Sequence, residues 1–424
     1  MSIDKRMASS PLSRKPKNIK HYNQRLVLSL LRNLETMTAS EISERINLSV
    51  TSVTKILALL QKHELVKAMG KGSSTEEGGK KPELYALNDT HKYLIAVHSG
   101  IGYIDCVLYD LKCVLINKLS NKYRNQASYE NCMEDIALAV KELVRSSGLV
   151  PEDIYGVVAG FDGIVDSDNG LLLFPIHNTA WGRNLAVVEK LKELMPEYYK
   201  ISINNGSRLS GYAEFLKHPD YKEENVMVII SGSFTGGCVL DHGKLVEGAN
   251  GLVGEFGHIT VVPDKATEKC ACGNYGCFET MVSPKAMIRY AGEIKDEYQD
   301  SQLLKNGDKL NYSGIFKASN EGDAFACKIM DRMISYFVML IRNMILIYNP
   351  RVIVLQGIYN QAGDYFLNKL QREIHSLPFF KIEKEFTLVY SDISLNHGCF
   401  TGGALYLADQ YFNEAELFIN QDQQ

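Results

Sequence analysis

The sequence predicts an α/β protein in which a small helical domain with a β-wing precedes two lobes of related layout. Residues 18–62 have the apolar spacing of three short helices. Further on, two stretches repeat the same order of strand, glycine-rich turn, strand, turn and strand, and helical sequence follows each. A chain of 424 residues is long enough for two to three domains.

Composition places the chain among water-soluble globular proteins. It is 45% hydrophobic and 23% charged, which is ordinary for that class. No apolar run approaches the roughly 18–20 residues that span a bilayer, and no signal-peptide core follows the polar start. The cysteines have no spacing typical of a disulfide framework, so we expect a cytoplasmic protein in a reducing compartment.

Charge is distributed unevenly along the chain. Residues 1–90 hold 15 Lys and Arg against 9 Asp and Glu, a net charge of +6, whereas the whole-chain totals of 46 and 50 leave −10 for the remainder. A basic N-terminal block can meet a polyanion such as DNA, and the acidic remainder is unsuited to that.

The N-terminal block carries the signals of a helix-turn-helix. Residues 1–18 are polar and basic and are expected to form a flexible tail. A first helix is predicted from Asn18 to about Glu35. Thr38 and Glu41 then have the spacing of a capping box, which predicts the start of a second helix.

The third helix is the candidate for DNA recognition. After a short turn at residues 47–49, Ser49 can cap this helix, which is predicted to run to about Lys62. Side chains near the N-terminus of the second helix of such a motif reach base edges in the major groove. The predicted buried stripe is Val53, Ile56, Leu57 and Leu60, and the candidate DNA-contacting residues are Ser49, Thr51, Ser52 and Lys55.

A β-wing is predicted to follow the helices. A glycine-rich polar loop leads through Lys80 and Lys81 to a predicted strand at Leu84–Leu87, so the basic tip could touch phosphate or the minor groove. We therefore predict a winged helix-turn-helix DNA-binding domain at residues 19–90. The alternative is a small helical bundle used for dimerisation; basic charge, spacing and wing together favour DNA.

Two copies of an α/β unit are predicted beyond residue 91. We expect a first lobe at 91–204 and a second at 205–424, whose C-terminal helix returns to the first lobe, with a ligand cleft between the two. The repeated strands are 94–97, 104–108 and 114–116, then 226–230, 238–240 and 245–246. The expected helices are 128–147, 183–194, 283–300, 323–348 and 361–376, with further strands near 155–158, 201–203, 351–355 and 386–390.

One short segment of the second lobe has the composition of a metal site. It contains an imidazole and three thiols, with Gly273 and Gly276 placed where a ligand loop must bend. A closed set of four N and S ligands is typical of structural Zn²⁺. The alternative is three buried cysteines and an unrelated histidine, but Cys-x-Cys-x4-Cys is rare by chance. The predicted ligands, which would orient the flanking Glu255 and Glu279, are His258, Cys270, Cys272 and Cys277.

These motifs resemble those of the ROK family, which comprises repressors, open reading frames and sugar kinases. The wing ends in Gly-Gly-Lys-Lys-Pro-Glu-Leu, and a later segment reads Gly-Leu-Val-Gly-Glu-Phe-Gly-His from Gly251 to His258. Cys-Ala-Cys-Gly-Asn-Tyr-Gly-Cys-Phe-Glu follows from Cys270 to Glu279. The resemblance covers nearly all of the chain. It implies an actin-like, ribonuclease H-like pair of lobes with a sugar site in the cleft, and Zn²⁺ on the four ligands above.

The chain departs from the kinases of that family at each phosphate-handling motif. Where they carry Asp-x-Gly-Gly-Thr, Gly-Thr-Gly-Ile-Gly and Glu-Asn-Asp-x-Asn, this chain has His98-Ser-Gly-Ile-Gly, Gly232-Ser-Phe-Thr-Gly and Asn204-Asn-Gly-Ser-Arg. Gly206 takes the position of the general base, so nothing there is expected to accept a proton from a sugar hydroxyl. Phe234 stands where a backbone must approach phosphate, and the usual Gly-Gly pair near adenosine is reduced to Gln356-Gly357.

The sugar side of the cleft matches the family better. Carboxylates and amides suit polyols because they bond adjacent hydroxyls. The alternative is that the two acids bond backbone near the metal. Because Gly206 enlarges one corner, a bulkier or phosphorylated sugar is possible, and Arg208 could attract its charge. The positions implied to bind sugar are Asn178, Asn205, Glu255, His258 and Glu279.

The sequence thus predicts a sugar-responsive transcriptional regulator, a repressor, that binds operator DNA as a homodimer or homotetramer and has no catalytic residue. One alternative is an active ATP-dependent sugar kinase carrying an appended DNA-binding domain. Another is a constitutive DNA-binding protein whose cleft no longer binds anything.

Overall fold

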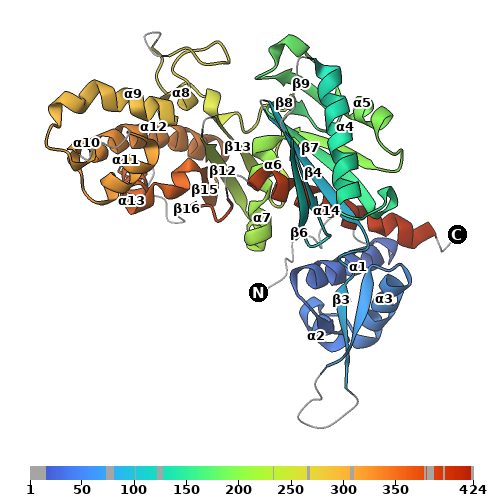
Figure 1. Cartoon of the computed structure of the whole chain (residues 1–424). Helices are drawn as coiled ribbons and strands as arrows, with labels where there is room; N and C mark the ends of the chain where they lie inside the picture. Colours follow the sequence, from blue (N-terminus) through green and yellow to red (C-terminus); the bar gives the residue numbers. More distant parts are fainter. Residues whose placement is uncertain are drawn as a thin grey trace.

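The structure is a computed structural model that describes residues 16–72, 81–100, 102–121, 128–232, 234–264, 268–305, 310–376, 379, 386–394 and 397–421. A winged helix, drawn in blue in Figure 1, lies below a first lobe, and a second lobe lies beside the first. The predicted fold class is confirmed: each lobe is built on a five-stranded sheet, and the order of the strands is β11-β7-β4-β5-β6 in one and β14-β13-β12-β15-β16 in the other.

The winged helix begins with α1, and its capping box is present as predicted. The Thr38 hydroxyl accepts from the backbone N of Glu41 at 3.2 Å, and the Glu41 carboxylate accepts from the backbone N of Thr38 at 2.7 Å. Asn47 ends α2 in the left-handed region and Ser49 caps α3. All four residues of the predicted stripe of α3 are buried. The elements are α1 (Pro16–Asn33), β1 (Met37–Thr38), α2 (Ala39–Ile46), α3 (Val50–Lys62), β2 (Val66–Lys71) and β3 (Glu83–Leu87).

Two predicted features of this domain fall wholly or mostly outside the described residues. Residues 1–15 of the expected tail are among them, and α1 already begins at Pro16. Residues 73–80, which include Lys80, also lie outside the described part of the chain.

In the first lobe, β4, β7 and β11 run parallel, and β4, β5 and β6 form an antiparallel meander. The predicted helix at 183–194 is wrong in its first turn. Leu185 and Ala186 pair instead with Leu172 and Leu171 in a small separate sheet, so the helix starts at Val187. The elements are β4 (Tyr93–Gly100), β5 (Tyr103–Tyr109), β6 (Leu115–Asn121), α4 (Tyr129–Ser146), β7 (Ile154–Phe161), β8 (Gly163–Asp166), β9 (Leu171–Pro175), β10 (Leu185–Ala186), α5 (Val187–Leu194) and β11 (Lys200–Asn205).

The second lobe repeats the meander in β12, β13 and β14 and adds β15 and β16 in parallel with β12. The helix predicted at 283–300 is shorter, because α9 ends at Ile294. The strands are β12 (Asn225–Ser231), β13 (Thr235–Asp241), β14 (Lys244–Leu245), β15 (Val352–Gly357) and β16 (Thr387–Tyr390). The helices are α7 (Glu214–Lys217), α8 (Phe278–Val282), α9 (Pro284–Ile294), α10 (Gln302–Lys305), α11 (Tyr312–Asn320), α12 (Ala324–Tyr348) and α13 (Gly363–Ile374).

Two helices lie between the sheets, α6 (Gly206–Tyr212) and α14 (Gly398–Gln421), as Figure 1 shows. They pack on each other, α6 also contacts β13, and α14 lies along β4 and β7. A single buried cluster runs from the winged helix through α14 into both sheets, so the winged helix shares a core with the lobes.

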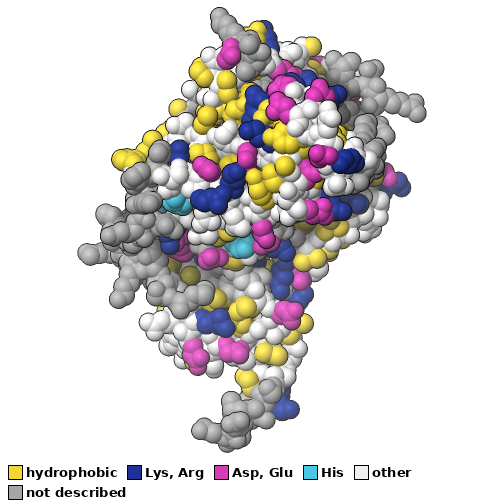
Figure 2. All heavy atoms as spheres, turned by 90° about the vertical axis from the view of Figure 1, so that its left-hand side faces the viewer, with side chains coloured by type: hydrophobic (Ala, Val, Ile, Leu, Met, Phe, Trp, Pro, Cys, Tyr) yellow, Lys and Arg dark blue, Asp and Glu magenta, His cyan; other side chains and the backbone are white. Residues whose placement is uncertain are grey.

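On the face that Figure 2 shows, acidic and basic side chains are interspersed among hydrophobic ones. No helix among the described residues is long and apolar enough to cross a membrane.

The junction between α1 and α14 is centred on one ion pair. Arg32 Nη1 donates to Asp409 Oδ1 at 2.6 Å, with the Arg32 side chain 11% exposed. Tyr212 Oη at 2.6 Å and Lys222 Nζ at 3.2 Å donate to the other carboxylate oxygen. Burial would raise the pKa of Asp409, but the charges of Arg32 and Lys222 outweigh it and lower that pKa. One carboxylate thus joins the winged helix, α6 and α14.

Replacing Arg32 by methionine should destabilise the protein, because it leaves Asp409, whose side chain is only 23% exposed, with weaker partners. Breaking a buried ion pair costs roughly 3–5 kcal/mol, and the remaining bonds from Tyr212 and Lys222 place this case at the lower end. The free energy of unfolding in urea measures the effect. Arg45→Met, at an exposed position of α2, is the control and should change it by less than about 0.5 kcal/mol; equal effects would contradict the role of the pair.

Candidate functional site

The structure brings the four predicted metal ligands together. One ligand atom from each of His258, Cys270, Cys272 and Cys277 lies within 4.8 Å of every other. Cys270 Sγ is 3.5 Å from His258 Nδ1, and Cys272 Sγ is 3.6 Å from Cys277 Sγ. A tetrahedral Zn²⁺ with Zn–S bonds of about 2.3 Å needs ligand separations of about 3.8 Å, so the residues fit such an ion.

Backbone contacts hold this loop in place. Gly276 has φ +66°, and a Cβ there would meet the carbonyl oxygen of Val262 at 1.5 Å, so only glycine fits. Gly273 also has positive φ, as its predicted place in a bend requires. Burial raises the pKa of the Cys270 and Cys277 thiols. A bound divalent cation would reverse this effect, because a coordinated thiol is deprotonated.

His258 connects the cysteines to the cleft. Its Nδ1 faces Cys270, and its Nε2 lies 3.9 Å from Glu255 Oε2. Burial raises the pKa of Glu255, a shift that His258 and Arg208 oppose. Glu279 Oε2 accepts from the backbone N of Thr235 at 2.7 Å, which is the kind of backbone bond that the alternative interpretation of these acids expects. Its other oxygen is 3.9 Å from Cys270 Sγ.

Asn205 lies where the two lobes meet. Its Oδ1 accepts from the backbone N of Ser207 and Arg208, and so caps α6. Its Nδ2 donates to the Gly163 carbonyl at 2.8 Å and to Glu255 at 3.5 Å. Both donors and both acceptor sites of this amide are therefore engaged, and Asn205 positions Glu255 in this structure.

The corner beside Gly206 contains two titratable groups that the sequence did not predict there. A Cβ at Gly206 would lie 3.3 Å from His98 Nε2 and 3.6 Å from Asp162 Oδ1. His98 comes from β4, and Asp162 follows β7. The sequence did not reveal this pair because its members are 64 positions apart. His98 was recognised only as the residue that replaces the acid of the first phosphate motif, and Asp162 lies in none of the motifs singled out above.

The segment after β9 of the first lobe meets the second lobe. The ring of His177 lies 4.3 Å from that of Phe234, which belongs to the β12–β13 turn of the second lobe. Asn178 precedes the short turn η4 (Thr179–Trp181) and lines a small hollow with Asp162 and His177. Asn178 therefore lies close to Asp162 and His177.

Arg208 does not face the cleft, which corrects the suggestion that it attracts a ligand phosphate. It is 1% exposed, and its guanidinium donates to the backbone carbonyls of Val165, Gly251 and Val253. Glu247 lies 3.6 Å from the same group. A guanidinium satisfied in this way has little capacity left for a ligand.

The candidate DNA-contacting side chains that are described lie on the surface. Ser49, Thr51, Ser52 and Lys55 are exposed at the start of α3, as is Lys81 beside the wing. The hydroxyls of Ser49 and Ser52 are 2.9 Å apart within the helix cap. Thr51 and Lys55 are four positions apart, so they share one face of α3.

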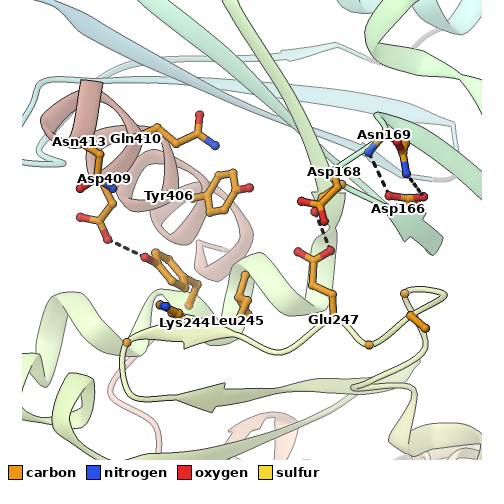
Figure 3. Close-up of a pocket in the computed structure, with 16 residues that line it drawn as sticks. Asp166, Asp168, Asn169, Lys244, Leu245, Glu247, Tyr406, Asp409, Gln410 and Asn413 are labelled. Atoms are coloured by element: carbon orange, nitrogen blue, oxygen red, sulfur yellow. Dashed lines mark hydrogen bonds between the residues drawn. The ribbon is translucent and has the colours of Figure 1, made fainter. Parts of the chain in front are cut away.

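A larger cavity of about 650 Å³, here called the hinge cavity, lies between the lobes and α14 (Figure 3). Most of its acids already have partners. Asp166 accepts from Asn169, Glu247 accepts from Ser167 and Asn204, and Asp409 accepts from Tyr212. The hinge cavity therefore leaves space where the lobes join, with three of its carboxylates already bonded within the protein, and we assign it no ligand.

Comparisons with known proteins agree with this architecture. The sequence profile of the ROK family matches residues 94–410, and that of the MarR family matches residues 21–69. A solved structure described as a ROK family transcriptional regulator, homologous to the E. coli MLC protein, superimposes with a TM-score of 0.75 at 21% identity. It covers 95% of this chain and 98% of that one.

Two curated relatives match different lengths of this chain. A glucokinase of Halalkalibacterium halodurans is 30% identical over 287 residues, covering 66% of this chain and 84% of the relative. A xylose repressor of Bacillus subtilis is 23% identical over 382 residues, covering 89% of this chain and 93% of the relative. The repressor match is thus the longer one.

Replacing Cys272 by serine should lower the zinc content of the purified protein, because it removes one of four converging ligands. The loss of zinc affinity should exceed the roughly 10- to 100-fold that removal of an outer-shell partner costs. Elemental analysis and chelator competition measure it. Cys327→Ser, on α12, is the control. Equal zinc in both variants would exclude Cys272 as a ligand.

Proposed function

This chain belongs to the ROK family, and we propose that it is a sugar-responsive, DNA-binding transcriptional regulator that acts as a repressor. The observation that carries the proposal is the packing of a winged helix onto a lobe of the cleft domain. The cleft keeps the acids at the sugar positions, whereas its phosphate positions are altered. The longer match to the xylose repressor supports this combination, although the sugar named there is a property of that protein.

The winged helix is proposed to bind operator DNA as part of a homodimer or homotetramer. Exposed Thr51, Ser52 and Lys55 would reach base edges, with Ser49 and the basic wing residues Lys80 and Lys81 on the backbone. Two such helices in a dimer would meet half-sites about 34 Å apart on the duplex. Such DNA binding requires a cytoplasmic protein, in line with the reducing compartment expected from the cysteines.

The cleft is proposed to bind the sugar effector. Hydroxyls of the sugar would bond directly to Glu255, Glu279 and Asn178. Asn205 would position Glu255. His258 would connect these acids to the loop that carries Cys270, Cys272 and Cys277. A structural Zn²⁺ on His258, Cys270, Cys272 and Cys277 would stiffen that loop. Hydrogen-bonding groups of this kind discriminate among sugars because an analogue that lacks a hydroxyl leaves a buried group unpaired.

Helix α6 offers a route from the cleft to the winged helix. Its N-terminus holds Asn205 and Gly206 at the cleft, and its last residue, Tyr212, bonds Asp409, the partner of Arg32. A sugar that favours one lobe closure would move α6 and so bias the position of α1. It can shift that equilibrium only by its differential affinity for the two arrangements.

The second candidate function is phosphoryl transfer to a sugar. The identity to the glucokinase and the presence of Asp162 beside Gly206 favour it. Against it, Phe234 occupies the turn that would approach phosphate and contacts His177 across the cleft. We therefore propose that the chain is not an enzyme, and sugar-dependent release of ADP from ATP would contradict this.

The full chain should select a two-fold symmetric site from a random duplex library at physiological salt, and one sugar of a panel should change its occupancy. Lys55→Ala should lower affinity for that site by at least about fivefold, because a base contact contributes roughly 1–3 kcal/mol. Lys317→Ala, on the exposed face of α11, is the control. Failure to select any site, together with ADP release, would identify a kinase.

Tyr212→Phe should weaken the response to sugar without changing sugar affinity, because it removes the bond to Asp409 and keeps the ring. Coupling between sites is typically 5- to 150-fold, and we expect the sugar-induced change in operator affinity to fall about fivefold or more. Tyr348→Phe is the matched control, since the Tyr348 hydroxyl donates one bond within the second lobe, to the carbonyl of Leu240. An unchanged response in Tyr212→Phe would exclude this route.

A further inference from the structure

Gly206 stands where the kinases of the family carry an acid, and side chains of the first lobe border this position. Gly206 begins α6, and the space where its Cβ would stand faces His98 Nε2 and Asp162 Oδ1 at 3.3 and 3.6 Å. An acid on α6 would therefore have to share this corner with a carboxylate already present. Like charges placed so close disfavour joint ionisation, which is consistent with glycine at this position.

His98 and Asp162 contact each other, and neighbouring side chains fix both of them. His98 Nε2 is 3.3 Å from Asp162 Oδ1, and His98 Nδ1 is 3.3 Å from the Tyr103 hydroxyl. His177 Nε2 lies 3.9 Å from the second oxygen of Asp162. Burial would raise the pKa of Asp162, but the bond and charge of His98, with the charge of His177, outweigh it and lower that pKa. Asp162 is thus an ionised carboxylate, 31% exposed, beside the expected sugar site.

Asp162 is connected to the acids of the second lobe through residues that contact both. Asn205 Nδ2 bonds both the carbonyl of Gly163, next to Asp162, and the carboxylate of Glu255. His177, beside Asp162, contacts Phe234, and the neighbouring Thr235 bonds Glu279. Carboxylates from both lobes are therefore linked through shared neighbours on the two sides of the Gly206 corner.

We propose, on the basis of the function proposed above, that His98 and Asp162 bind the effector hydroxyl next to Gly206 and that the effector is an uncharged sugar. The Asp162 carboxylate can accept from two hydroxyls, and the imidazole fixes its orientation. A phosphorylated sugar would bring a charge of about −1.5 to −2 near Asp162, Glu255 and Glu279, while the imidazoles of His98 and His177 are already paired with Asp162. Arg208, which could have balanced that charge, is occupied by backbone carbonyls.

Calorimetric titration of the full chain tests this inference. The probes are D-glucose, D-xylose and N-acetyl-D-glucosamine, with glucose 6-phosphate and N-acetylglucosamine 6-phosphate as their charged counterparts. At least one neutral sugar should bind, and the phosphate ester of a bound sugar should bind at least about tenfold more weakly, because like charges in an interface repel. Tighter binding of an ester than of its parent sugar would overturn the inference.

Variants then test the two residues with the sugar that binds best. Asp162→Asn should lower its affinity about 10- to 100-fold, as expected for loss of a charged hydrogen bond, and His98→Gln should lower it less. Asp168→Asn, an exposed position six residues further on, is the matched control and should leave it unchanged. Thermal unfolding of the sugar-free variants verifies that each is folded.

Gly206→Ala supplies an independent test by filling the corner. Gly206 is not among the glycines with positive φ, so alanine is compatible with the backbone, and its methyl should lower sugar affinity. Unchanged affinity in both Asp162→Asn and His98→Gln would overturn this inference and leave the proposed regulator intact. Binding of no sugar of either kind to the unmodified chain would overturn the proposed function and this inference together.

Discussion

The arrangement of the cleft depends on how one buried charge is satisfied. Arg208 is 1% exposed and lies on α6, between the two lobes. An unpaired buried charge would cost several kcal/mol, so its guanidinium draws in backbone carbonyls from β8 and from the loop before Glu255. That loop leads directly into Glu255 and His258. The backbone just before Glu255 and His258 is therefore fixed by an arginine whose donors are bonded within the protein.

The same helix gives the cleft a mechanical connection to the winged helix. A helix of seven residues is only about 10 Å long, and α6 spans the distance from Gly206 at the cleft to Tyr212 at Asp409. Asp409 in turn bonds Arg32 on α1. Because the winged helix shares a continuous core with α14, it is not tethered by a loose linker. A displacement of α6 would therefore move the side chains that pack against it. Packed side chains switch between discrete arrangements rather than deforming continuously.

Local signals in the sequence predicted most of the fold, because helix caps and apolar spacing act over a few residues. Thr38 and Ser49 start their helices as predicted. The prediction of a helix at 183–194 was wrong for its first turn, because Leu185 pairs with Leu172 in a β-sheet. Such a tertiary contact cannot be read from helical spacing in the sequence. His98 and Asp162 could not be predicted as a pair for the same reason. The prediction that Arg208 attracts a ligand charge was wrong because arginine is ordinarily exposed. Only the fold shows that backbone carbonyls bind its guanidinium.

The altered motifs of the cleft suit a sensor for a physical reason. Turnover requires groups that stabilise a transition state more than the bound substrate, and these groups include the phosphate loops and a base aligned with the reacting hydroxyl. A regulator needs only a difference in ground-state affinity between two lobe arrangements. In the proposed site, Glu255 on the second lobe and Asp162 on the first would supply that difference, because a sugar bonded to both would be bound most tightly when the lobes hold them close together. Residues that would handle phosphate contribute nothing to this difference, so a histidine at position 98 and an exposed phenylalanine at position 234 are compatible with sensing.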